Sequence, residues 1–135
     1  MIQRLTEEQV LGVNVELCTA TGENSACLDR DGLLAALARP FSGFGDREFY
    51  ATVWDKTAAL LHGIASRQVF ENGNKRTAWS CAVIFLDLNG IDLGYVPTVH
   101  ANMFVRAVGL DHSLEIADVA EWFEVTYELG RPEPR

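Results

Sequence analysis

Apolar residues recur at helical spacing along most of the chain, and glycine or proline residues interrupt the pattern. The first stretch opens with a capping-box sequence over residues 6–9 and should end near Gly22. The second runs over residues 29–38 and stops before Pro40, which cannot continue a helix. The remaining helical stretches cover residues 48–66, 74–88, 97–108 and 114–129. The sequence therefore predicts an all-α fold, a compact bundle of about six helices.

The composition fits a single globular domain over residues 1–135. Hydrophobic residues make up 48% of the chain and charged residues 22%, as in ordinary soluble proteins. No apolar run follows residues 1–4, so we expect no signal peptide, no membrane span and a cytoplasmic location. The net charge of -8 argues against binding to nucleic acid or to acidic membranes, because both need clustered cations. A locally basic site or a basic protein partner is still compatible with this negative net charge.

The chain has three cysteines, Cys18, Cys27 and Cys81, without the paired spacing of metal ligands. An odd number of thiols fits reduced cysteines in a cytoplasm better than a disulfide framework. We expect each of them to be buried and structural rather than catalytic. The tryptophans, at positions 54, 79 and 122, lie on apolar helical faces and are expected to pack in the core.

Residues 68–76 carry the clearest chemical signal in the chain. Gly73 permits backbone conformations in which N–H groups converge on an anion, and Asn74 can hold a phosphate or the loop itself. Lys75 and Arg76 add positive charge at the start of an apolar helix, where unpaired N–H groups already attract anions. This pattern favours a phosphate site. On the residues alone, an exposed basic turn that caps a helix is the alternative.

Residues 70–77, Phe-Glu-Asn-Gly-Asn-Lys-Arg-Thr, resemble the signature of the Fic fold in the branch of the death-on-curing (Doc) toxins. That branch has the pattern His-x-Phe-x-(Asp or Asn)-(Ala or Gly)-Asn-Lys-Arg. The resemblance extends to residues 28–40, 58–65 and 85–90. It implies an all-α fold and an enzyme that transfers a phosphate-containing group from a nucleotide to a protein hydroxyl.

The Doc resemblance implies the toxin of a toxin–antitoxin system. Its reaction would be transfer of a phosphoryl group from ATP, with Mg²⁺, to a threonine of elongation factor Tu, which blocks translation. Gly73, Asn74, Lys75 and Arg76 would hold the nucleotide phosphates, and Asn72 would take the metal-ligand position. An asparagine there, in place of aspartate, lowers the negative charge available to Mg²⁺. A cognate antitoxin would fold as a helix into a surface groove and inhibit the toxin in trans.

Gln68 departs from the family pattern, because it stands where the family has the histidine that takes the proton from the attacking hydroxyl. A carboxamide has no useful basicity, and general-base help is worth about 10²–10⁴-fold in rate. We therefore expect this chain to be catalytically crippled. An introduced or selected change that permits production of a toxic enzyme is favoured, because the rest of the signature is intact; a natural non-catalytic relative is the alternative. His62 is expected to pack or lie at the surface and is no convincing substitute.

Two other functions stay open. Adenylyl-transferring Fic proteins usually have glycine where this chain has Lys75, and a second arginine where it has Trp79. The Doc-type phosphotransferase is therefore favoured over an adenylyltransferase. A non-catalytic binding module that keeps only the groove of the fold is the third hypothesis.

Two further segments bear on the family resemblance. Residues 19–24 formally fit an inhibitory pattern, (Ser or Thr)-x-x-x-Glu-(Gly or Asn), in which a helical glutamate pairs with the signature arginine. Gly22 lies inside the pattern and disfavours a helix, so a chance match is favoured.

Residues 41–46 form a glycine-rich loop with Phe41 and Phe44. This loop is either a flap that docks the backbone of a target protein or an ordinary surface loop with two aromatic side chains tucked in.

Overall fold

The structure is a computed structural model that describes residues 1–131. These residues form six α-helices, a short 3-10 helix and a two-stranded hairpin, so the predicted all-α fold is confirmed. The elements are α1 (Glu7–Thr21), α2 (Arg30–Ala38), η1 (Arg39–Phe41), β1 (Gly43–Phe44), β2 (Arg47–Glu48), α3 (Val53–Ala65), α4 (Asn74–Leu88), α5 (Thr98–Leu110) and α6 (Ile116–Leu129). Within residues 1–131, none of the helices combines the length and the apolar character that a bilayer crossing requires.

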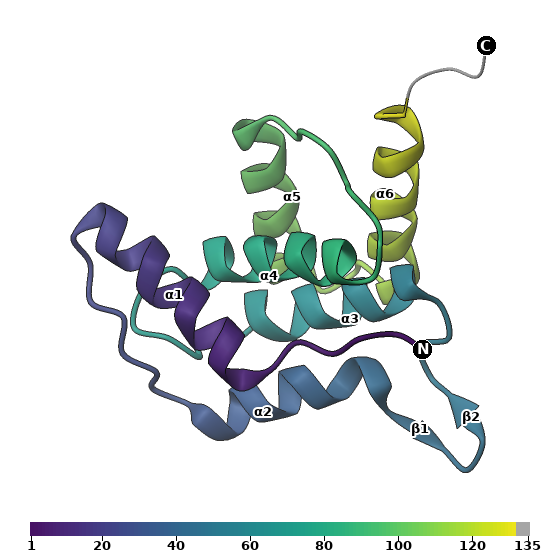
Figure 1. Ribbon diagram of the computed structural model, residues 1–135, viewed down its shortest axis with the longest axis horizontal. Coiled ribbons are helices and arrows are strands. Elements are labelled where there is room, and N and C mark those ends of the chain that lie inside the picture. The colour runs from purple at the N-terminus through teal and green to yellow at the C-terminus, as the bar shows by residue number, and fades with distance from the viewer. Residues whose placement is uncertain (132–135) are drawn as a thin grey trace.

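Helix α3 lies at the centre of the molecule and packs against α2, α4, α5, α6 and η1. Figure 1 shows α3 and α4 side by side, with α1 and α2 on one side of them and α5 and α6 on the other. Most residues of α3 are buried, as expected of a helix surrounded by others. Gly63 allows the close approach of α2, because a Cβ at this position would lie 3.1 Å from the Cβ of Ala36.

An aromatic cluster joins α4 to α5 and α6. The rings of Phe104 and Trp122 stack with centroids 3.7 Å apart, and Trp79 stacks on Phe123 at 6.0 Å. Trp54 packs separately against Tyr127 at 5.5 Å. The three tryptophans therefore pack against the core, as predicted, and each keeps part of its surface exposed.

The predicted helix over residues 48–66 begins five residues later than expected, at Val53. Thr52 caps α3 through a capping box with Asp55, in which the Thr52 hydroxyl accepts from the Asp55 N–H at 3.0 Å. Glu48 lies instead in β2 and pairs with Gly43 of β1. The apolar residues of the hairpin happen to continue the helical spacing, but the capping residues Thr52 and Asp55 determine where the helix starts.

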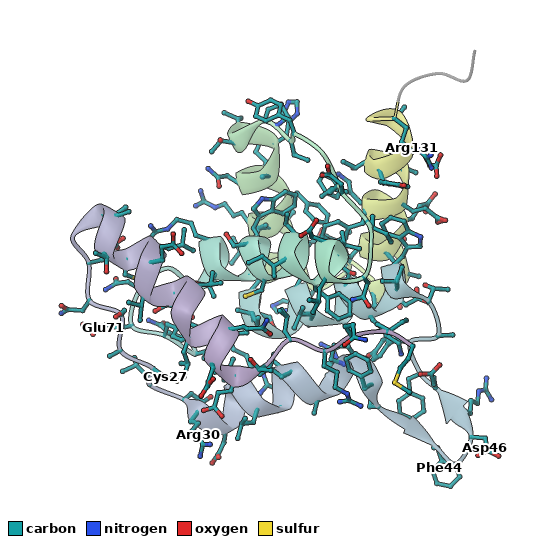
Figure 2. The ribbon with its side chains drawn as sticks, viewed as in Figure 1. Cys27, Arg30, Phe44, Asp46, Glu71 and Arg131 are labelled. Atoms are coloured by element: carbon teal, nitrogen blue, oxygen red, sulfur yellow. The ribbon has the colours of Figure 1, made fainter. Side chains whose placement is uncertain are left out.

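The loop over residues 41–46 combines features of both alternatives that the sequence left open. Phe41 is tucked in and packs edge-on against Phe85, with ring centroids 6.3 Å apart. Phe44 is 82% exposed, and Figure 2 shows it beside Asp46 at the tip of the hairpin, away from the helices. One aromatic ring thus anchors the segment, and the other is presented to solvent.

Lys56 attaches the base of this hairpin to α3. Its side chain is almost fully buried, and its ammonium donates to the carbonyl oxygens of Pro40 at 3.1 Å and Tyr50 at 2.6 Å. It also forms an ion pair with Glu48 Oε1 at 3.0 Å. A buried ammonium is tolerated only with such partners, so these three acceptors account for its position.

The cysteines differ in exposure. Cys18 and Cys81 are buried as predicted, but Cys27 is exposed, so the prediction of burial was wrong for that residue. Cys27 lies in an extended segment that pairs with Phe70 through its backbone, and such a pairing leaves its side chain free to face solvent. Burial in apolar surroundings raises the pKa of the Cys81 thiol to about 12.

We predict that one thiol of the native protein reacts rapidly with a disulfide reagent at neutral pH. Cys27 is accessible, whereas Cys81 is both buried and held in its unreactive protonated form. Absorbance titration with Ellman's reagent should count one fast thiol before unfolding in guanidinium and three afterwards. A Cys27→Ser variant should have no fast thiol, and a fast phase that persists in it would contradict the assignment.

Candidate functional site

The loop between α3 and α4 is fixed by backbone pairing with the segment before α2. The carbonyl oxygen of Val69 accepts from the N–H groups of Leu28 at 2.8 Å and Asp29 at 3.1 Å. The N–H of Glu71 donates to the carbonyl oxygen of Ala26 at 2.9 Å. The side chains of Val69 and Phe70 are fully buried, so Phe70 anchors the loop in the core.

The side chain of Asn74 closes the loop onto itself. Its Oδ1 accepts from the Phe70 N–H at 2.9 Å, and its Nδ2 donates to the Phe70 carbonyl oxygen at 2.8 Å. The sequence allowed Asn74 to hold either a phosphate or the loop, and its amide is engaged in the loop. Asn74 is therefore available to an anion through its backbone N–H.

Helix α4, like α5, begins without a side-chain cap. Gly73 is its N-cap residue, adopts a left-handed conformation with φ of 75°, and provides no side-chain cap. By contrast, at the start of α1, α2 and α3 the side chain of the N-cap residue accepts from a backbone N–H of the first turn. The first N–H groups of α4, including those of Asn74, Lys75 and Arg76, have no partner within the helix. Their dipoles and the two cationic side chains favour an anion at this end.

The structure brings all the predicted site residues together. A surface hollow of about 370 Å³ is lined by Gln68, Glu71, Asn72, Gly73, Asn74, Lys75 and Arg76. Gln68 and Lys75 are exposed, and the other predicted residues are half-buried. Backbone donors, two cations and amide groups therefore surround one small polar space. This set is suited to holding phosphate oxygens.

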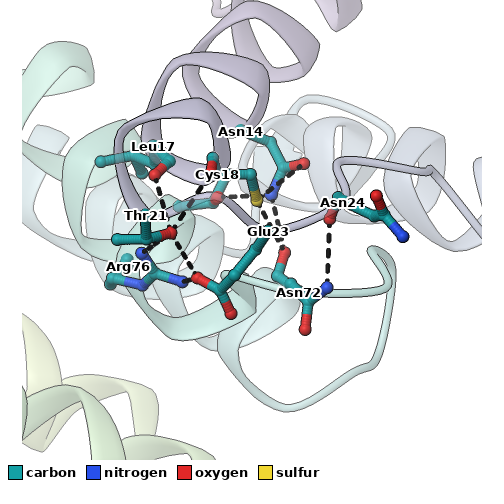
Figure 3. A network of polar contacts seen from close by, with 9 residues as sticks. Asn14, Leu17, Cys18, Thr21, Glu23, Asn24, Asn72 and Arg76 are labelled. Carbon is teal, nitrogen blue, oxygen red and sulfur yellow. Dashed lines mark hydrogen bonds and ion pairs between the residues drawn. The ribbon is translucent and has the colours of Figure 1, made fainter.

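Arg76 is engaged in an ion pair that crosses from α4 to the end of α1 (Figure 3). Its Nη2 lies 2.6 Å from Glu23 Oε1, and its Nη1 donates to the Thr21 hydroxyl at 3.4 Å. The hydroxyl of Thr21 also donates to Glu23. The hydrogen bonds that Glu23 accepts, from Thr21 first and from Arg76 second, lower the pKa of its carboxyl. The Glu23 carboxylate is thus paired with the Arg76 guanidinium, which the sequence predicted to bind phosphate.

This ion pair bears on the inhibitory pattern at residues 19–24. Helix α1 ends at Gly22 as predicted, and Gly22 adopts a left-handed conformation there. Glu23 lies beyond the helix, yet it makes the contact between glutamate and signature arginine that the pattern describes. The sequence favours a chance match, because Gly22 disfavours the helix that the pattern requires. In the structure the turn after α1 brings Glu23 to Arg76 without a continuous helix.

A larger groove adjoins the hollow and shares Lys75 and Arg76 with it. Its volume is about 740 Å³, and it runs between the end of α1, the first turns of α4 and one face of α5. Trp79, Val105 and Leu110 contribute apolar surface, and Arg106 adds a third cation. The groove is therefore apolar along its floor and positive along its rim.

His62 lies apart from this hollow and provides no replacement for the missing histidine. It is half-buried, and its Nδ1 accepts from Arg39 Nη1 at 2.7 Å, since a guanidinium has no acceptor. Burial first, and the nearby charge of Arg39 second, lower the pKa of its imidazole. Among residues 1–131, no three His, Cys, Asp or Glu side chains gather as metal ligands would.

These features define a class of protein: a small all-α protein with a glycine-containing, basic loop at a helix N-terminus. Residues 4–86 match the family described as Fic/DOC, and this match spans the loop and all but the end of α4. The chain belongs to the Fic/DOC family.

The chain is also similar to the protein Toxin Doc from Mycolicibacterium smegmatis (strain ATCC 700084 / mc(2)155). The two are 48% identical over 63 residues, which cover 46% of this chain and 48% of that protein. The chain thus matches about half the length of this curated relative. The resemblance to the Fic/Doc family that the sequence indicated is confirmed.

We predict that Gly73→Ala destabilises the protein more than Gly90→Ala. Both glycines have positive φ, 75° and 82°, which costs an L-residue roughly 1–2 kcal/mol. At Gly73 the added Cβ would also lie 3.3 Å from both Asn14 Nδ2 and Cys18 Sγ, whereas nothing lies within 4 Å at Gly90. Urea unfolding should show the larger loss of unfolding free energy for Gly73→Ala. Equal losses of unfolding free energy for the two variants would contradict this prediction and would mean that Asn14 and Cys18 move aside at little cost.

Proposed function

We propose that this chain is the toxin of a toxin–antitoxin pair, a Doc-type protein kinase that transfers a phosphoryl group from ATP to a threonine of elongation factor Tu. The observation that carries the proposal is the hollow at the start of α4, where Gln68 and the signature residues from Glu71 to Arg76 meet. Membership of the Fic/DOC family and the similarity to Toxin Doc support it. Such a reaction would stop translation in the cell.

In the proposed reaction the acceptor hydroxyl attacks the γ-phosphorus of ATP. A new O–P bond forms, the bond from the γ-phosphorus to the bridging oxygen breaks, and ADP leaves. The N–H groups at the start of α4, with Lys75 and Arg76, would hold the phosphate oxygens as charge shifts toward the leaving group. Glu23 would compete with the phosphate oxygens for Arg76, because it already engages Nη2 of the same guanidinium.

The residues of the hollow fit a magnesium ion held mainly by the nucleotide. Figure 3 shows that the Asn72 amide nitrogen turns toward the Asn24 carbonyl, to which it donates at 3.2 Å, so its oxygen lies on the other side. Glu71 adds a carboxylate at the same hollow. Mg²⁺ is commonly bound by one or two protein oxygens together with phosphates. When bound, it would neutralise charge on the transferred group.

Proton transfer is the step at which this chain falls short. Gln68 lines the hollow from the position of the family histidine, but its carboxamide cannot accept the proton of the acceptor hydroxyl. Binding of the donor depends on Lys75, Arg76 and backbone groups, and not on residue 68. The chain is therefore proposed to bind Mg-ATP while transferring the phosphoryl group very slowly.

The groove beside the hollow is the proposed seat of the cognate antitoxin. Its apolar floor suits the apolar face of a helix, and Lys75, Arg76 and Arg106 on its rim suit acidic side chains. The rest of this chain carries an excess of negative charge, so these cations would also orient an acidic segment toward the groove. A segment seated there would cover two of the cations proposed to hold the donor.

We predict that Arg76→Ala weakens binding of Mg-ATP by about 1.5–3 kcal/mol, the range for hydrogen bonds to charged groups. Arg30→Ala is a matched control, because Arg30 forms a comparable exposed ion pair with Glu7 at 2.7 Å and does not line the hollow. Glu23→Gln should strengthen binding by up to about five-fold, since it removes an exposed competing carboxylate. Calorimetry measures all three. Equal affinities for Arg76→Ala and Arg30→Ala would remove Arg76 from the site.

We predict that Gln68→His raises the rate of transfer to elongation factor Tu by at least about 10²-fold, because a neutral imidazole can accept the hydroxyl proton. The variant should arrest bacterial growth, and co-expression of the cognate antitoxin should relieve the arrest. Gln68→Asn is the control, since it keeps a carboxamide and should gain nothing. Mass spectrometry of the acceptor measures the group transferred.

The added mass separates the alternatives. A phosphoryl increment supports the proposed kinase, whereas an adenylyl increment would replace it with a Fic-type adenylyltransferase. A folded Gln68→His protein that modifies nothing and does not affect growth would favour a non-catalytic binding module. Circular dichroism of each variant establishes that the fold is intact.

A further inference from the structure

One face of α1 carries a polar residue where the helix is otherwise apolar. Val10, Asn14 and Cys18 follow one another at intervals of four residues, and all three are fully buried. A carboxamide in such a position costs free energy unless hydrogen bonds replace those it made with water. The contacts of Asn14 therefore indicate why it is tolerated.

The amide of Asn14 donates both of its hydrogen atoms, one to the loop before α4 and one to the first turn of α4. Its Nδ2 donates to the carbonyl oxygen of Asn72 at 2.9 Å and to the hydroxyl of Thr77 at 3.0 Å (Figure 3 draws the first residue pair). The Cys18 thiol, a weaker donor, lies 3.8 Å from its Oδ1 and 3.6 Å from the same Asn72 carbonyl oxygen. One buried side chain of α1 thus holds the residue before Gly73 and a residue one turn later.

The bond to Asn72 determines how the peptide between Asn72 and Gly73 is oriented. A trans peptide is planar, so the carbonyl oxygen of Asn72 and the N–H of Gly73 point in opposite directions. Because the oxygen points at Asn14, the N–H points away from α1. Rotation of this peptide would turn an oxygen, instead of a hydrogen, toward the phosphate site. Glycine offers little resistance to such a rotation, so an outside contact is needed to prevent it.

We propose that Asn14 is a positioning residue for the donor phosphates. It holds the Asn72 carbonyl oxygen on the side of α1, and so keeps that oxygen from repelling an anion at the N-terminus of α4. It acts through the loop backbone and does not line the hollow itself. The inference rests on the proposed function, since it concerns the same phosphate site.

Binding of Mg-ATP to the full chain tests the proposal. Asn14→Leu keeps the volume of the side chain but removes its donor. It should weaken binding about tenfold or more, because the Gly73 N–H would lose its hydrogen bond to a charged phosphate. Val10→Ala is the matched control on the same buried face: it lowers stability without touching the loop and should keep affinity within about twofold of the parent. Thr77→Val removes the second acceptor only and should also bind nearly as the parent does.

Backbone NMR provides a readout that a purely structural role would not move. The Asn72 carbonyl carbon and the Gly73 amide should shift strongly in Asn14→Leu, and little in Val10→Ala or Thr77→Val. If Asn14→Leu does not fold, Asn14→Ser provides the same comparison, because its hydroxyl is too short to reach Asn72.

The outcomes separate the inference from the proposed function. A folded Asn14 variant with parental affinity and unshifted Asn72 and Gly73 signals overturns the positioning role. Equal weakening by Val10→Ala at a matched loss of stability overturns it as well. A parent chain that binds no Mg-ATP sinks the proposed function instead, and the NMR comparison still decides whether Asn14 orients the peptide.

Discussion

The candidate site depends on the backbone pairing of residues 69–71 with residues 26–29. These two segments lie far apart in the sequence, and three hydrogen bonds of 2.8–3.1 Å join them next to the buried side chains of Val69 and Phe70. Because the pairing fixes where the loop leaves the core, it also fixes where α4 can begin. The Asn74 side chain then closes the loop on Phe70, and Gly73 provides the left-handed turn into the helix. Displacing Phe70 would therefore move every group that lines the hollow.

The hollow at the start of α4 is positively charged, although the molecule as a whole is negatively charged. The chain has a net charge of -8, yet the start of α4 collects Lys75, Arg76 and a row of unpaired N–H groups. Glu23 satisfies Arg76 when no other anion is bound, and the exposure of this pair keeps its strength modest. A multiply charged phosphate group can therefore displace the carboxylate at small cost. In this way the ion pair keeps Arg76 near the hollow without closing it.

The helices and the signature loop could be predicted from local sequence, because helical spacing, capping residues and the glycine at position 73 act over short distances. The prediction failed where tertiary contacts decide. Helical spacing continued into residues 48–52, but pairing with β1 and the Thr52 cap placed that segment outside α3. The contact between Glu23 and Arg76 spans 53 residues, and that between Asn14 and Asn72 spans 58. Only the polar residue on the apolar face of α1 hinted at the second contact.

The buried ammonium of Lys56 also determines how the hairpin responds to a visiting protein. Swinging the hairpin would separate that ammonium from the Pro40 and Tyr50 carbonyl oxygens and from Glu48. An unpaired charge in the core is strongly unfavourable, so the hairpin base is rigid although its tip is exposed. A protein that contacts the hairpin would thus meet a base whose conformational entropy was already lost on folding, with the exposed ring of Phe44 at its tip. Selectivity among partner proteins would then come from the fixed position of the hairpin base and not from a change of its conformation on binding.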